Sequence, residues 1–253
     1  RGLIEARRAA TAVGADLRIV SAGLGLVDAR ATVPAYSLTV AGGDPDSIAY
    51  KVERGFAPGD WWRALQGALK MPERALEELL SSRRGLAILG LPSTYLELIT
   101  DELRAMPADV LSRVRIIGPP RGSVPAELVH VWMPYDARFD GEGSPTPGTR
   151  GDFAQRAARH FAEEVVCRAP EATPADHAEM VERCLDPLAP SGHPRRVAGS
   201  DAELIAVIRE LLPRSGGRSG ETLRLLRRHA GRACEQGRFR RLFAAAIQGE
   251  LVR

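Results

Sequence analysis

The chain has 253 residues, of which 44% are hydrophobic and 26% charged. This is the composition of a folded globular protein, long enough for one large domain or two small ones. It argues against a membrane-spanning protein, because apolar runs such as residues 86–91 are far shorter than the roughly 20 residues of a span. Its three cysteines are too few and too unevenly spaced for a disulfide framework, so we expect a cytoplasmic protein.

Positive charge is concentrated near the C-terminus. Residues 1–150 carry 18 basic and 18 acidic side chains, and residues 151–208 carry 6 and 10. Residues 209–253 carry 11 basic and 4 acidic side chains, a net charge of +7. All basic residues except Lys51 and Lys70 are arginines. A concentrated basic segment favours a polyanionic partner.

In the first part of the chain, apolar runs alternate with helical patterns. Helical patterns cover residues 4–13, 61–69, 72–81 and 92–104. Short apolar runs typical of buried strands cover residues 17–22, 85–90, 114–118 and 128–133. The alternation predicts an α/β domain over residues 1–138, with a mostly parallel sheet flanked by helices.

The second part of the chain has a helical pattern throughout. Residues 139–151 are rich in Gly and Pro, which predicts a linker. An all-α region over residues 152–253 follows. Its expected helices cover residues 152–166, 174–185, 200–212 (ended by Pro213), 222–229 and 235–248. We expect residues 200–253 to form a basic module that ends in a helix-turn-helix-like pair.

The segment over residues 21–39 carries the most distinctive pattern. A predicted strand runs into two glycines, and a Pro-x-Tyr follows after a polar loop. Glycines allow close approach of a ligand, and strand ends are common ligand sites. We therefore predict ligand binding by Ser21, Gly23, Gly25 and Tyr36, with Asp28 as a catalytic carboxylate. The alternative is a tight turn with Tyr36 packed over it. In that case the Asp28 carboxylate forms hydrogen bonds with the backbone of its own turn.

The same segment resembles a known family signature. The residues that match are Ser21, Ala22, Gly23, Gly25, Leu26, Pro34, Tyr36 and Thr39. They are similar to the SA-(K/G)-x-GL…P-x-Y-x-x-T pattern of uncharacterised bacterial and phage domains related to YaaA peroxide-stress proteins, and more distantly to the uracil-DNA-glycosylase-like fold. The resemblance implies nucleic-acid-related work, in a modification or phage-defence context. It also implies that relatives have a strand, with a Cys- and Lys-containing motif, upstream of this point.

A second group of candidate residues lies in the basic C-terminal segment. Two predicted helices, joined by a short Gly-containing turn, present arginines and a small apolar core between them. The expected nucleic-acid-binding residues are Arg224, Arg227, Arg228, Arg232, Arg238, Arg240 and Arg241. Arginine grips phosphate or guanine, and the second helix of such a pair can enter a major groove. A solvated basic face or a docking surface for an acidic protein is the alternative.

Other polar groups predict no metal site and no cofactor. The spacings between Cys167, His177, Cys184 and His193 match no compact zinc motif. Trp61 and Trp62 are adjacent and cannot share one helix face, so we expect one in the core and one at a surface or interface.

These observations support three hypotheses. The leading one is a cytoplasmic nucleic-acid-binding protein, acting on DNA through its C-terminal arginines. The second is a base- or nucleoside-modifying enzyme with its site in residues 21–36. The third is a non-catalytic subunit that docks a partner protein.

Overall fold

The computed structural model describes residues 1–53, 55–141, 143–190 and 197–248. The chain forms two compact units, Arg1–Ser191 and Gly192–Arg253. Each unit has its own apolar core.

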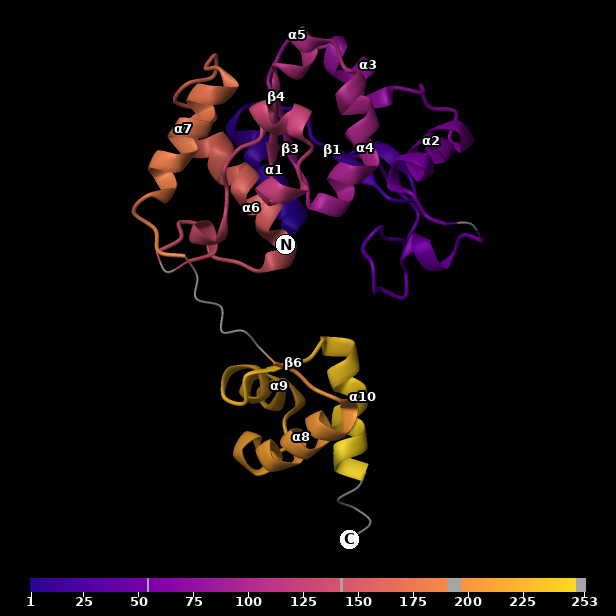
Figure 1. Cartoon of the computed structure of the whole chain (residues 1–253), viewed down its shortest axis with the longest axis vertical. Helices are drawn as coiled ribbons and strands as arrows, with labels where there is room; N and C mark the ends of the chain where they lie inside the picture. The colour runs from indigo at the N-terminus through magenta and orange to yellow at the C-terminus, as the bar shows by residue number, and fades with distance from the viewer. Residues whose placement is uncertain (54, 142, 191–196, 249–253) are drawn as a thin grey trace. The chain divides into compact units, whose positions relative to one another are not determined.

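The first unit mixes helices with short strands (Figure 1). Its α-helices are α1 (Gly2–Ala12), α2 (Pro58–Ala68), α3 (Ala75–Ser81), α4 (Ser93–Ala105), α5 (Ala108–Leu111), α6 (Phe153–His160) and α7 (Pro174–Leu185). Its strands are β1 (Arg18–Ser21), β2 (Gly25–Asp28), β3 (Ala87–Gly90) and β4 (Val114–Ile117). A π-helical turn, η6 (Phe161–Val166), continues α6. The unit also contains short 3-10 turns: η1 (Ile48–Tyr50), η2 (Arg121–Ser123), η3 (Ala126–Val131), η4 (Ala137–Asp140) and η5 (Arg150–Asp152).

The sheets of this unit are small. Strands β1 and β2 form an antiparallel hairpin, and β3 pairs in parallel with β4. A single parallel bridge joins Ile116 of β4 to Trp132. The predicted mixture of helix and parallel strand is confirmed, whereas the described residues form no large parallel sheet.

The prediction of a fourth strand over residues 128–133 was wrong. Pro125 precedes the 3-10 turn η3, in which Leu128 and Val131 are both fully buried. Residues three apart lie on the same side of a 3-10 helix. The apolar residues of this run can therefore be buried together without the backbone forming an extended strand. Only Trp132, after the turn, pairs with the neighbouring strand.

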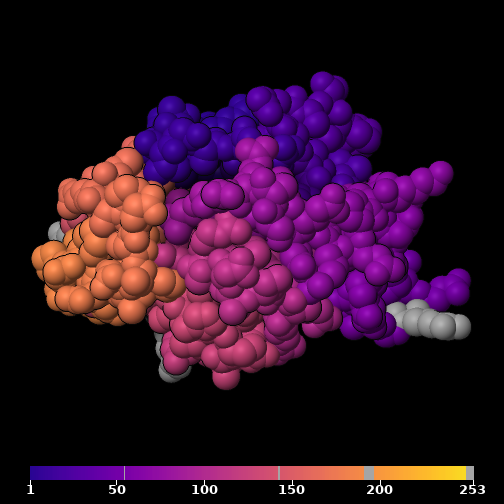
Figure 2. Space-filling model, turned by 90° about the horizontal axis from the view of Figure 1, so that it is seen from above, coloured from indigo at the N-terminus to yellow at the C-terminus, as the bar shows by residue number. Residues whose placement is uncertain are grey.

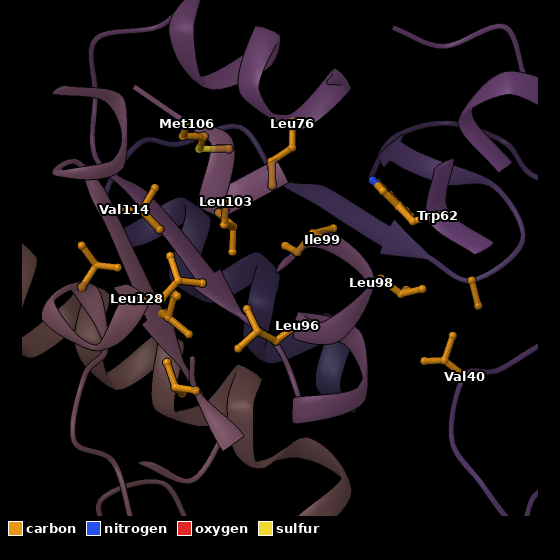
Figure 3. Packing of buried hydrophobic residues seen from close by; sticks show 14 of the residues in the cluster. Val40, Trp62, Leu76, Leu96, Leu98, Ile99, Leu103, Met106, Val114 and Leu128 are labelled. Carbon is orange, nitrogen blue, oxygen red and sulfur yellow. The ribbon is translucent and has the colours of Figure 1, made fainter. Parts of the chain in front are cut away.

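The larger core of the first unit lies between α2, α3, α4 and the β3–β4 pair (Figure 3). Helix α4 contributes Leu96, Ile99 and Leu103, all at most 1% exposed, from one helical stripe. Trp62 of α2 is also buried, as expected for one of the two tryptophans. Trp61 is half-buried and donates its indole N–H to Ala22 O at 2.8 Å, so it fixes α2 against the hairpin.

A buried carboxylate joins the three helices of this core. Glu102 accepts hydrogen bonds from Trp62 Nε1 (2.6 Å), Gln66 Nε2 (2.5 Å) and the backbone N–H of Leu76 (2.9 Å). A buried carboxylate is tolerated only when donors satisfy it, and these donors come from α2 and α3. Glu102 is therefore a structural residue.

The predicted linker over residues 139–151 is instead part of the first unit, and the boundary between units lies near residue 191. The reason is Arg156 of α6, which is 1% exposed. Its guanidinium pairs with Asp140 (2.6 Å) and Asp152 (2.7 Å) and donates to Thr146 O (2.7 Å). The rings of Phe139 and Phe153 flank it, with centroids 5.8 and 5.9 Å away.

Helix α7 is fixed to β4 by a second buried arginine. Arg115 Nε donates to His177 Nδ1 (2.9 Å), and its Nη2 donates to Ala172 O (2.9 Å). His177 Nε2 therefore carries the proton and donates to Ala169 O (2.8 Å). Burial lowers the pKa of Arg115 to about 10, so it stays charged at neutral pH.

The second unit packs helices around one core. It contains β5 (Val197–Ala198), α8 (Asp201–Ser215), α9 (Ser219–Arg228), β6 (Arg232–Ala233) and α10 (Gln236–Gln248). Leu204 and Ile208 of α8, Leu226 of α9 and Phe239 of α10 meet in its core. The predicted helical C-terminal region is thus confirmed, although its first two helices, α6 and α7, belong to the first unit.

Two details of the second unit differ from expectation. Pro213 does not end α8, which continues to Ser215 and is closed by Gly216 in a left-handed conformation (φ +58°). No short turn joins α9 and α10, because residues 229–235 lie between them and include β6, which pairs in parallel with β5.

We predict that Arg156→Met destabilises the first unit by about 3 kcal/mol, because it leaves Asp140 and Asp152 without their buried cation. Urea unfolding measures the loss, and limited proteolysis should show new cleavage within residues 139–151. Arg150→Met, at an exposed position in the same segment, is the control and should behave as wild type. Equal stability of the two variants would contradict this role of Arg156.

We also predict that mild acid destabilises the first unit. Burial lowers the pKa of His160 and of His177 below the ordinary 6.5. Above pH 6.5 both rings are neutral in the folded and the unfolded chain, so neither adds a pH dependence. Below it, the unfolded chain binds protons that the folded unit excludes, and the free energy of unfolding falls by up to about 1.4 kcal/mol per pH unit for each histidine.

Urea unfolding at about pH 7.5 and pH 5.5 tests this, since the carboxylates titrate mainly at lower pH. His130→Asn, at an exposed position, is the control and should retain the full dependence. Unchanged stability between the two pH values would contradict the prediction.

Candidate functional site

The predicted ligand-binding residues of the first unit gather at the turn of the β1–β2 hairpin. Ser21 and Gly25 face each other as the last paired residues of the two strands. The hydroxyl of Tyr36 is hydrogen-bonded to Ser21 Oγ, and a Cβ on Gly23 would lie 3.2 Å from the Tyr36 ring. Tyr36 itself is 46% exposed. The sequence pattern therefore identified residues that do lie together.

The hairpin turn already uses the backbone amides that an anion would need. Leu24 N–H donates to Ser21 Oγ at 3.0 Å, and Gly23 N–H points to the same oxygen at 3.4 Å. Ser21 thus closes the turn locally. This geometry matches the alternative of a tight turn covered by Tyr36.

Gly25 is required by the backbone and by its neighbour. Its φ is +68°, which side-chain-bearing residues rarely adopt. A Cβ at this position would come within 2.6 Å of Met71 Sδ. The hairpin turn itself therefore requires this glycine.

Asp28 lies at the other end of the hairpin, where it is paired with Arg18 in the strand register. Its carboxylate contacts Arg18 Nη1 (2.7 Å) and Arg30 Nη2 (3.0 Å), and it accepts the backbone N–H of Arg30 (2.8 Å). Hydrogen bonds from Arg30 hold the pKa of Asp28 well below its ordinary value. A carboxylate held ionised in this way is a weak base and no proton donor at neutral pH, so the geometry favours a structural ion pair.

The candidate nucleic-acid-binding arginines of the second unit fall into two groups. Four are engaged or half-buried. Arg238 contacts Asp201 Oδ1 and Gly199 O, Arg227 donates to Cys234 O (2.8 Å), Arg224 pairs with Glu221, and Arg232 lies half-buried on β6.

The second group comprises Arg228 of α9 and Arg240 and Arg241 of α10. All three are exposed. Within the described residues none of them forms a hydrogen bond or an ion pair. These three, called the unpaired arginines below, have no hydrogen bond or ion pair within the described residues that must break before they bind an external anion, although the charge of Arg241 contributes to a lowered pKa of Glu235.

The outer face of α9 is slightly hollowed. Thr222, Leu225 and Leu226 point into the core, which leaves the opposite side of the helix exposed. A hollow of about 280 Å³ lies there, lined by Gly220, Leu223, Arg224, Arg227 and Arg228. Residues three and four apart on a helix are surface neighbours, so the three arginines of this hollow share one face.

The cysteines and histidines show individual structural roles. His177 uses both ring nitrogens within the fold, for Arg115 and Ala169. Cys167 is exposed and Cys184 half-buried, while His193 lies outside the described residues. No group of potential metal ligands occurs in the part of the chain that the structure describes.

Sequence reasoning missed the buried polar residues Glu102, Arg115, Arg156 and His160. Each had a signal. Arg115 interrupts the apolar run of β4, and Asp152 and Arg156 have the i, i+4 spacing of a helical ion pair. His160 shares a buried hydrogen bond of 2.7 Å with Tyr135, which only the fold brings near it.

Comparison with known proteins adds no relative. No family model, curated protein or solved structure matches the chain. Among the described residues, no helix is both long and apolar enough to cross a bilayer.

We predict that Gly25→Ala destabilises the first unit by about 1–2 kcal/mol, because alanine is strained at positive φ. Thermal or urea unfolding measures the effect. Gly42→Ala is the matched control, since Gly42 has open space around it and no positive φ. A Gly25→Ala variant as stable as the control would contradict this prediction. It would show that the backbone of the hairpin turn can adjust to a side chain at this position.

Proposed function

We propose that the second unit binds nucleic acid, DNA in the first instance, through its exposed arginines. The observation that carries this proposal is the set of unpaired arginines on α9 and α10.

The two units differ in the sign of their charge. Residues 1–191 contain 22 basic and 26 acidic side chains, whereas residues 192–253 contain 13 basic and 6 acidic ones. The second unit therefore carries +7 and the first −4. A positive potential over a small unit attracts polyanions and accelerates encounter with them.

Arginines of the first unit are largely occupied by its own carboxylates. Arg138 pairs with Asp136 and Glu182, and Arg159 pairs with Glu5 and Glu163. Such pairs must be broken before a phosphate can bind. The unpaired arginines need no such step, and each phosphate they neutralise releases condensed counterions.

Contacts of this kind recognise the phosphate backbone more than base edges. The hollow on α9 is open and lined by three arginines, Leu223 and Gly220, without Asn or Gln side chains that would read adenine. The proposal is therefore binding with little sequence selectivity and strong salt dependence. A modification or phage-defence context, a base-modifying site at residues 21–36 and a role as a protein-docking subunit stay predictions from the sequence.

The test is fluorescence anisotropy with the full chain and a random-sequence DNA duplex, in a salt series starting at about 50 mM. Changing Arg228, Arg240 and Arg241 together to Gln should weaken binding. It should also reduce the steepness of log K against log salt by about 2–3 units.

The control variant changes Arg63, Arg84 and Arg150 of the first unit to Gln, which removes the same charge from exposed positions. It should keep the wild-type slope. The proposal fails if the wild-type chain does not bind the duplex at low salt, or if both triple variants lose affinity equally.

A further inference from the structure

A second groove lies in the first unit, away from the hairpin. It is an open depression of about 440 Å³ between α7 and residues 121–134. Its walls are mostly apolar, formed by Val129, Trp132, Pro134, Pro174 and Ala178. Figure 2 shows α7 (orange) packed beside this segment (pink). Its volume falls within the range of small-molecule sites, about 300–1,000 Å³.

The groove lies near the carboxyl edge of the parallel strands. Strand β4 ends at Ile117, and Arg121 of the groove follows within a few residues. Trp132 is the residue that pairs in parallel with β4, and its indole N–H donates to Pro119 O at 2.9 Å. The carboxyl ends of parallel strands are where α/β proteins commonly bind small ligands.

Trp132 and Arg121 form a combined aromatic and cationic surface. The hydrogen bond to Pro119 fixes the indole, and the Arg121 guanidinium lies over its ring at 5.8 Å from the centroid. Arg121 is exposed and, among the described residues, pairs with no carboxylate. A planar guanidinium beside an indole can hold an anion while the ring supplies stacking area.

The groove also carries three other ionisable side chains, His130, Glu179 and Glu182. His130 is exposed on the wall that carries Trp132. On α7, Glu182 is occupied by Arg138 at 2.6 Å, whereas Glu179 has only a distant partner in Arg183 (3.8 Å). Thr173 and Asp176 already cap the N-terminus of α7. Among the residues described around the groove, Arg121 carries the guanidinium that can pair with an anion.

We propose that this groove binds a small ligand with a flat aromatic ring and an anionic group, of the size of a nucleoside monophosphate or an aromatic carboxylate. The ring lies against Trp132 and the apolar wall, and the anion pairs with Arg121. Glu179 can accept a hydrogen bond from an amino group on the ring. This site is separate from the arginines of the second unit and does not depend on DNA binding.

The test titrates the full chain with adenosine monophosphate and follows the indole N–H resonances by NMR. The signal that disappears in Trp132→Phe belongs to Trp132. We expect a saturable shift of that signal in the wild-type chain, and binding about tenfold weaker in Arg121→Gln. Adenosine and inorganic phosphate, each lacking one half of the ligand, should bind more weakly than the nucleotide.

A parallel titration with 4-hydroxybenzoate distinguishes a carboxylate from a phosphate as the preferred anion. Arg84→Gln, at an exposed position in the same unit, should bind as wild type, and so should the triple variant at Arg228, Arg240 and Arg241. The proposal is overturned if neither probe shifts the Trp132 signal, or if Arg121→Gln binds both probes as tightly as wild type.

Discussion

The enclosure of Arg156 determines where the first unit ends. A buried guanidinium is tolerable only with anions and hydrogen-bond acceptors around it, and Asp140, Asp152 and Thr146 supply these. These acceptors lie within or beside the Gly- and Pro-rich residues 139–151. Their contacts with Arg156 therefore hold this segment against α6. Helix α6 packs on α1 and β3, and α7 packs on the turn that follows α6. The first unit thus continues to about residue 191.

The position of this boundary also determines the net charge of each unit. With α6 and α7 in the first unit, their acidic residues stay there, and the short second unit retains a net +7. The folding constraint and the proposed function are connected in this way. The first unit pairs most of its arginines internally, while the second presents Arg228, Arg240 and Arg241 to solvent.

The sequence predicted local structure better than tertiary contacts. Strands β1, β3 and β4 and most helices follow from apolar runs and caps such as Ser200 with Glu203. The 3-10 turn η3 was missed because it has only six residues. Over so short a stretch, the spacing of apolar residues in a strand and in a 3-10 helix cannot be told apart. In the hairpin, the sequence pattern selected Ser21, Gly23 and Tyr36, which lie together in the structure, while their binding of a ligand stays a prediction. It could not show that Ser21 already accepts the turn amides, because that depends on backbone direction.

Hydrogen exchange of the full chain, with and without a DNA duplex, tests the central claim most directly. The account predicts that bound DNA slows amide exchange in α9 and α10 and leaves the hairpin at Ser21 and Gly25 unchanged. Protection confined to the hairpin, or the absence of protection in both units at low salt, would contradict it.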